Sequence, residues 1–196
     1  MPDVSRKPAT YADLEAVPPH LVAEILDGEL VTHPRPAPKH SAVQSALNTK
    51  IGAPFQFGMR GPGGWIFMME PELHLGPHVI VPDIAGWRTE RLPAVPEAAW
   101  IELVPDWACE VLSPSTRRDD RGRKSRIYAA YGMAYLWLLD PIVRELDALE
   151  LFQGKWTSLG NFSDDDVVAV APFTAVPLSL LDIWPAERPM PPNDKS

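Results

Sequence analysis

Short apolar runs divided by turn residues dominate the N-terminal part of the chain. Residues 10–13 carry a capping-box pattern, which predicts a short helix that the prolines at 18–19 end. Residues 22–26 and 29–33 are strand-like runs joined by residues 27–28, an Asp-Gly pair suited to a two-residue turn with positive φ. We therefore expect a helix followed by a β-hairpin in this part.

From residue 40 onward the hydrophobic pattern switches between the period of a helix and the long apolar runs of buried strands. The predicted order is helix 40–57, strands 65–75, 79–87 and 107–112, helix 117–131, strand 134–140, a hairpin of strands 145–152 and 155–159, and a short helix 178–184. This order predicts an α/β fold whose core is helix, three strands, helix, strand. One hairpin is added on the N-terminal side of the core and one on the C-terminal side.

The composition is that of one ordinary globular domain. The 196 residues are 45% hydrophobic, enough for one sizeable core, and we assign residues 1–184 to a single domain. Residues 185–196 are rich in proline and are expected to form a disordered tail. No apolar run reaches the length of a membrane span and residues 1–7 lack the apolar core of a signal peptide. We therefore expect a cytoplasmic protein without a membrane partner.

Charge is distributed unevenly along the chain. The formal net charge of −8 argues against broad, charge-driven binding of nucleic acid. Six of the 18 basic residues nevertheless fall within the ten positions 117–126. This run predicts either a positive ridge on an acidic body or a solvated helix face with internal ion pairs, and charge alone does not separate the two.

One carboxylate stands out because it lies inside an apolar strand. Glu110 interrupts residues 107–112, where an ionised side chain needs a cation, a hydrogen-bond donor or a metal as partner. A second acid, Asp83, lies in the preceding predicted strand. Cys109 alternates with Glu110 and cannot form an internal disulfide, so we expect it to pack as a small hydrophobe on the opposite face.

The basic helix has an apolar stripe that can face the sheet, formed by Ile127, Tyr128 and Tyr131. Lys124 lies three and four residues before the first two of these and begins the same stripe. Its stem can lie along apolar surface while its ammonium reaches towards Glu110.

Five segments resemble the Uma-two family of the restriction-endonuclease-like, or PD-(D/E)XK, superfamily. They span most of the chain and comprise residues 24–30, 38–40, 81–84, 110–124 and 135–141. The superfamily motif is Pro-Asp followed by an acid, one spacer residue and a lysine. Asp83 and Glu110 match the two acids, but Leu112 occupies the usual lysine position. The resemblance implies that the lysine has moved to Lys124, and that Glu24 is a further acid of the site.

The same resemblance implies a metal-dependent endonuclease that hydrolyses phosphodiester bonds, with DNA as its partner. Asp83 and Glu110 would hold Mg²⁺, for which Mn²⁺ can substitute, because Mg²⁺ prefers a few carboxylate oxygens together with water and phosphate. Lys124 would orient the attacking water or balance the charge of the phosphorane. Arg117 and Arg121 would contact flanking phosphates, and His40, which matches a family histidine, is grouped with these nucleic-acid-binding candidates.

Other interpretations remain open. Asp83 fits a strand end, Lys124 a surface lysine, Glu24 a solvated edge residue and His40 a helix-end or core histidine. The main rival function is a binding module of the same fold that no longer cleaves and contacts nucleic acid or protein. A third is an interaction protein without a nucleic-acid role, which the net charge favours. Hairpins and aromatic residues at the surface further suggest a homodimer.

Overall fold

The N-terminal helix and hairpin form where the turn and cap residues predict them. In the computed structural model, which describes residues 7–185, helix α1 (Tyr11–Glu15) begins after Thr10, whose side chain accepts from the Asp13 N–H while the Asp13 carboxylate accepts from the Thr10 N–H. Strands β1 (Leu21–Leu26) and β2 (Glu29–Pro34) pair antiparallel. Their turn, Asp27-Gly28, has φ angles of 53° and 79°, as the sequence predicts.

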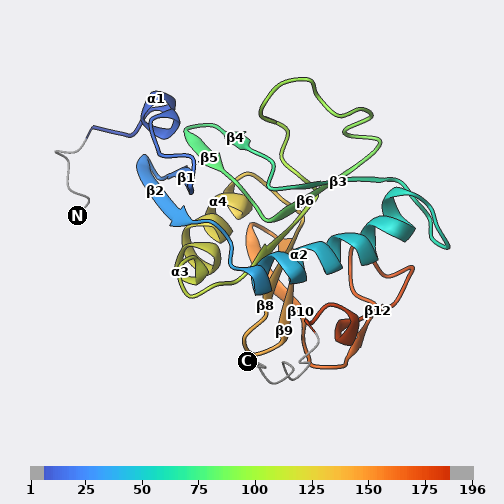
Figure 1. The fold of residues 1–196 in the computed structure, drawn as a ribbon. Helices are drawn as coiled ribbons and strands as arrows, with labels where there is room; N and C mark the ends of the chain where they lie inside the picture. Colours follow the sequence, from blue (N-terminus) through green and yellow to red (C-terminus); the bar gives the residue numbers. More distant parts are fainter. Residues whose placement is uncertain (1–6, 186–196) are drawn as a thin grey trace, which may run out of the picture.

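Two sheets organise the chain, and Figure 1 shows them meeting beside helix α2. The four-stranded sheet has the order β2-β1-β5-β4, with β4 at Leu73–Leu75 and β5 at His78–Ile80. The six-stranded sheet has the order β10-β9-β8-β7-β6-β3. Its strands are β3 (Trp65–Met69), β6 (Ile84–Arg88), β7 (Trp107–Val111), β8 (Tyr135–Asp140), β9 (Glu145–Phe152) and β10 (Lys155–Ser163).

Helices cover both faces of the larger sheet. Helix α2 (Pro38–Ile51), extended by the π-helical turn η1 (Gly52–Gln56), contributes to one hydrophobic cluster. The helical segment between β7 and β8 contributes to the other, and consists of α3 (Arg117–Asp119), the π-helical turn η2 (Asp120–Lys124) and α4 (Ser125–Ala130). This crossover joins the two parallel strands β7 and β8, whereas all other pairings in this sheet are antiparallel. The predicted core of helix, three strands, helix and strand is confirmed.

The strands predicted over 65–75 and 79–87 are each broken in two. The breaks lie at residues 70–72 and 81–83, where this long hairpin passes from the larger sheet to the smaller one. Pro71 and Pro82 lie in the breaks and lack the N–H that a continuous strand would donate. Asp83 therefore lies between β5 and β6 and not within a strand, which corrects the expectation from sequence.

Smaller differences concern the C-terminal part and one aromatic residue. Residues 178–184 are not a helix: β12 (Leu178–Ser179) pairs with β11 (Val167–Val168), and only Leu180–Asp182 form a short 3₁₀ turn. Tyr131 is 37% exposed and lies against the smaller sheet, with its ring centroid 6.0 Å from that of His78 on β5 and its hydroxyl beside Gly76. The predicted tail at 185–196 falls, apart from Pro185, outside the described residues. No helix within residues 7–185 is long and apolar enough to cross a membrane.

Alternating residues of β7 separate two cores. Cys109 is fully buried with Trp107 and Val111 on the α2 side, as its alternation with Glu110 predicts, and Ala108 packs on the side of the basic helix. On the α2 side the Phe173 ring has its centroid 4.9 to 5.7 Å from five aromatic rings, those of Phe55, Trp65, Phe67, Trp107 and Trp137. This aromatic cluster makes one side of the sheet rigid and tightly filled.

Gly86 of β6 leaves room for that cluster, and we expect Gly86→Val to destabilise the fold. A Cβ there would lie 2.7 Å from Phe67 Cε1 and 3.3 Å from Trp107 Cε3. Overpacking of this kind costs about 1–3 kcal/mol, measurable by urea denaturation. Gly122→Ala is the control, because a Cβ at Gly122 meets no atom within 4 Å and should stabilise the helix by up to about 1 kcal/mol. Equal stabilities of the two variants would contradict this packing.

Candidate active site

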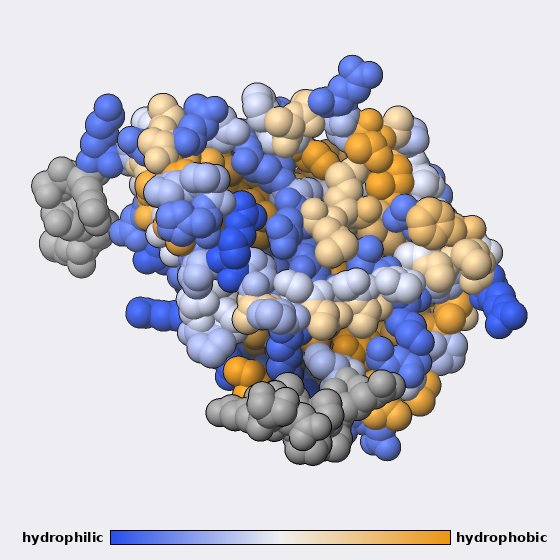
Figure 2. All heavy atoms as spheres, viewed as in Figure 1, coloured by the Kyte–Doolittle hydropathy of each residue, from blue (hydrophilic) through white to orange (hydrophobic). Residues whose placement is uncertain are grey.

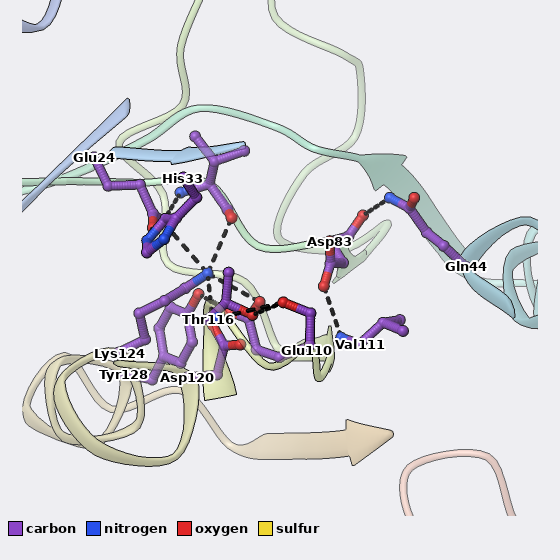
Figure 3. A network of polar contacts seen from close by, with 12 residues as sticks. Glu24, His33, Gln44, Asp83, Glu110, Val111, Thr116, Asp120, Lys124 and Tyr128 are labelled. Atoms are coloured by element: carbon purple, nitrogen blue, oxygen red, sulfur yellow. Dashed lines mark hydrogen bonds and ion pairs between the residues drawn. The ribbon is translucent and has the colours of Figure 1, made fainter. Parts of the chain in front are cut away.

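The predicted acids and lysine meet in one pocket at the junction of the two sheets. The pocket has a volume of about 250 Å³ and is lined by the N-terminal hairpin, the break at residues 81–83, the end of β7 and the basic helical segment. Glu24, His40, Asp83, Glu110 and Lys124 all line it. Figure 3 shows most of these side chains pointing towards one another from separate elements.

Glu110 lies at the bottom of the pocket and is only 1% exposed. The Tyr128 hydroxyl donates to its Oε1 at 2.5 Å, and the Lys124 ammonium donates to its Oε2 at 2.9 Å. Burial raises the pKa of Glu110 well above its ordinary value. The Lys124 charge opposes that rise, while the nearby carboxylates of Asp120 and Asp83 add to it. The predicted contact between Lys124 and Glu110 is therefore confirmed.

The Lys124 ammonium is surrounded by oxygen atoms. Besides Glu110, it lies 3.1 Å from the Val81 carbonyl, 3.3 Å from Glu24 Oε1 and 3.4 Å from Asp120 Oδ1. Burial alone would lower the pKa of Lys124, but the carboxylates of Glu110 and Glu24 outweigh burial and raise the pKa well above its ordinary value. Lys124 is thus a buried cation.

One carboxylate oxygen of Asp83 is held by neighbouring groups, and the other is not held by any described residue. Its Oδ2 accepts from the Val111 N–H at 2.6 Å and lies 3.3 Å from His40 Nε2. Its backbone carbonyl accepts from Gln44 Nε2 at 2.7 Å, and Gln44 lies one turn after His40 on α2. Within residues 7–185 no donor bonds Oδ1, and the side chain is 16% exposed. One carboxylate oxygen of Asp83 therefore remains open to the pocket.

His40 is tied to Asp83 by electrostatics as well as by distance. Burial lowers the pKa of His40, but the hydrogen bond and the charge of Asp83 outweigh burial, so that the pKa is raised from its ordinary value. The sequence grouped His40 with the phosphate contacts. The structure places His40 in the lining of the pocket, next to the Asp83 carboxylate. Its contact with phosphate stays a prediction.

Glu24 of β1 binds the backbone of the break at residues 81–83. Its Oε1 accepts from the Val81 N–H at 2.8 Å, and its Oε2 lies 3.7 Å from Nε2 of the buried His33. Glu24 is 2% exposed and so is not a solvated edge residue. The hairpin β1–β2 thereby completes the carboxylate cluster around Lys124.

Four residues of the site were not among those predicted: His33, Gln44, Asp120 and Tyr128. Two of them carry a spacing signal, because Asp120 and Tyr128 lie four residues on either side of Lys124 and share its buried face. Gln44 likewise follows His40 by four residues. His33 has no such signal, since only the hairpin register places it opposite Val22 and near Glu24.

Arg117 and Arg121 do not line the pocket. Arg117 forms an ion pair with the buried Asp140 at the end of β8, and Arg121 Nη1 lies 2.7 Å from Asp147 Oδ2 on β9. Both guanidinium groups already have acidic partners. Their contact with phosphate remains a prediction.

The acid content of the pocket fits a divalent cation. Lys124 is the one lysine among five lining carboxylates, those of Glu24, Glu70, Asp83, Glu110 and Asp120. Burial raises the pKa of Asp120 as it does that of Glu110, so further positive charge would stabilise both ionised groups. No three His, Cys, Asp or Glu side chains in the described part of the chain form a ready metal cage. Mg²⁺ takes one or two carboxylates from a protein and keeps water in its shell, so it needs fewer side-chain ligands than such a group supplies.

Comparisons with known proteins agree with this geometry. The Uma2 family, described as "Putative restriction endonuclease", matches residues 8–181. The crystal structure of "a putative nuclease belonging to DUF820" from Anabaena variabilis is similar with a TM-score of 0.73 and 25% sequence identity, covering 90% of this chain and 98% of that chain. No curated protein matches the chain. The fold is thus the restriction-endonuclease-like one, and the chain belongs to the Uma2 family that its motifs resemble.

Proposed function

We propose that the protein is a Mg²⁺-dependent endonuclease that hydrolyses phosphodiester bonds in DNA. The observation that supports this most directly is the pocket in which Asp83, Glu110 and Lys124 meet, with one oxygen of Asp83 left open. Membership of a family described as restriction endonucleases supports the same reaction class. Two carboxylates beside a buried lysine suit the hydrolysis of a phosphate ester, because the transition state carries additional negative charge.

Asp83 and Glu110 would hold the metal ion from two directions. When bound, Mg²⁺ polarises the scissile phosphate and acidifies a water molecule. The Val111 N–H and His40 keep Asp83 oriented, and Tyr128 does the same for Glu110. Because these supports come from a helix, a strand and a crossover segment, the two carboxylates are preorganised before substrate binds.

Lys124 would act as an electrostatic stabiliser. Its three ammonium protons face four oxygen acceptors, so a substrate oxygen or the attacking water would have to take the place of one of these contacts, of which those to Glu24 and Asp120 are the longest. The cation lies in a buried site, where its attraction for developing charge is stronger than in water. Lys124 thereby takes the role that the superfamily motif gives to the position of Leu112, which here is 1% exposed within an apolar cluster.

The direct test is a titration of Mg²⁺ and Mn²⁺ with the full chain and circular or linear DNA. We expect cleavage that requires the divalent ion and that stops when EDTA removes it, because neither carboxylate alone activates water. Gel electrophoresis of the products measures the reaction. DNA binding without cleavage at any concentration of either ion would favour a binding module of the same fold.

Asp83→Asn should weaken metal binding at least about tenfold, or about 1.4 kcal/mol, while the fold is retained. Asparagine keeps the size of the side chain but loses the charge that faces the pocket. Isothermal calorimetry with Mn²⁺ measures the affinity. Asp182→Asn is the matched control, because Asp182 is half exposed and pairs with Lys50 outside the pocket. Unchanged metal affinity in folded Asp83→Asn protein would remove Asp83 as a ligand.

Lys124→Ala should lower the cleavage rate about a hundredfold or more, the scale expected for loss of one electrostatic stabiliser, and leave metal binding nearly intact. Rates are compared per folded molecule, with circular dichroism reporting the folded fraction. Arg126→Ala is the control on the same helix, since Arg126 is exposed and only loosely paired with Asp27. A folded Lys124→Ala enzyme that cleaves at the parental rate would rule out the relocated lysine.

A further inference from the structure

Most cations of the basic segment already have acidic partners. Five of its six basic side chains are paired: Arg117 with Asp140, Arg121 with Asp147, Arg123 with Glu29 and Asp119, Lys124 with Glu110, and Arg126 with Asp27. The sixth, Arg118, is exposed and forms no ion pair or hydrogen bond with any other described residue. Six basic residues lie at positions 117–126, but the acidic partners of five of them reduce the positive charge that this segment presents to a ligand.

Arg118 does not itself line the pocket but lies two residues after the pocket-lining Thr116. It follows residues 113–116, which line the pocket and lead into α3. Being exposed, it can turn towards a ligand that lies over the pocket mouth without breaking an existing contact. No other arginine of the basic segment has this freedom.

Two more cations lie across the pocket, one in the link between β2 and α2 and one in the first turn of α2. Arg35 lines the pocket, and its guanidinium donates a hydrogen bond of 2.9 Å to the Pro19 carbonyl, which carries no charge. Lys39 lies between the pocket-lining Ala37 and His40, is exposed, and has no acidic partner within the described residues. In Figure 2 strongly hydrophilic side chains lie over the end of β2 and beside α3, two elements that Figure 1 labels.

Unpaired cations matter here because the pocket itself is acidic. Opposite unit charges 4 Å apart near a protein surface attract by about 4 kcal/mol. When an arginine contacts a carboxylate, the two opposite charges largely cancel, and the pair attracts a nearby phosphate only weakly. Arg35, Lys39 and Arg118 keep their full charge, and they stand where a phosphate would approach the carboxylates of the pocket.

We propose that Arg35, Lys39 and Arg118 form a phosphate-binding rim, and that a nucleic-acid backbone crosses the pocket between the β2–α2 link and α3. This inference rests on the proposed function and replaces Arg117 and Arg121 as the phosphate contacts. The pocket, at about 250 Å³, is smaller than the roughly 300–1,000 Å³ that hold drug-sized ligands. It admits about one phosphodiester unit, and the rest of the strand lies on the rim.

The test measures DNA binding without cleavage, as fluorescence anisotropy of a labelled duplex and of a labelled single strand in EDTA at several salt concentrations. The variants are Arg35→Gln, Lys39→Gln and Arg118→Gln in the full chain. Each should flatten the slope of log affinity against log salt by about 0.9 on a duplex or about 0.7 on a single strand. The loss should be the same for unrelated sequences, since phosphate contacts carry no sequence information.

Arg121→Gln and Arg126→Gln are matched controls from the paired arginines of the same segment, and we expect the parental slope for both. A slope that falls for Arg121→Gln and not for the rim variants would overturn the rim. If the rim variants keep the parental slope while the parent still cleaves DNA with Mg²⁺, the rim is wrong and the proposed function stands. If the parent neither binds nor cleaves either DNA, both are wrong.

Discussion

The structure depends most on the buried ammonium of Lys124. It joins three separate elements, through Glu110 on β7, Glu24 on β1 and the Val81 carbonyl at the hairpin break, to its own helical segment. It also pairs with Asp120 one turn earlier on that segment. Removing one partner from a buried ion pair costs about 3–5 kcal/mol, because the other charge is left unpaired. The charges that we propose to act in catalysis, those of Lys124 and its carboxylate partners, therefore also hold the two sheets together. We expect substitutions of these residues to lower the stability of the fold.

The position of Asp83 follows from a constraint on the backbone. A strand that continued through residues 81–83 would fix the direction of this side chain by its alternation with neighbours, and the carboxylate would belong to one sheet. Pro82 ends the ladder, so the aspartate is held by other means: the Val111 N–H of the adjacent strand, His40, and Gln44 through the backbone. The break at residues 81–83 thereby lets the Asp83 carboxylate reach the pocket that lies between the two sheets.

Much of the fold and part of the site could be predicted from local pattern. The Asp27-Gly28 turn and the buried run of β7 carry their signals within a few residues, and Lys124 could be assigned to Glu110 because its helical stripe faces the sheet. The hydrophobic pattern does not predict the hairpin breaks at Pro71 and Pro82, because apolar residues continue on both sides of each proline. The acid partners of Arg117 and Arg121 could not be predicted, because Asp140 and Asp147 lie on strands placed there only by sheet pairing.

The same pairing bears on how a chain of net charge −8 would approach DNA, the substrate that we propose. Long-range repulsion between the acidic body and a phosphate backbone is screened within about 8 Å at physiological ionic strength. Binding then depends on the charges nearest the ligand. On the basic segment these charges are mostly cancelled by neighbouring carboxylates, whereas at the edges of the pocket they are not. The cations of the protein thus have separate roles, since one buried lysine orders the acids and the paired arginines fasten the helical segment to the sheets. In the rim that we propose, Arg35, Lys39 and Arg118 have no acidic partner among the described residues and would meet the ligand.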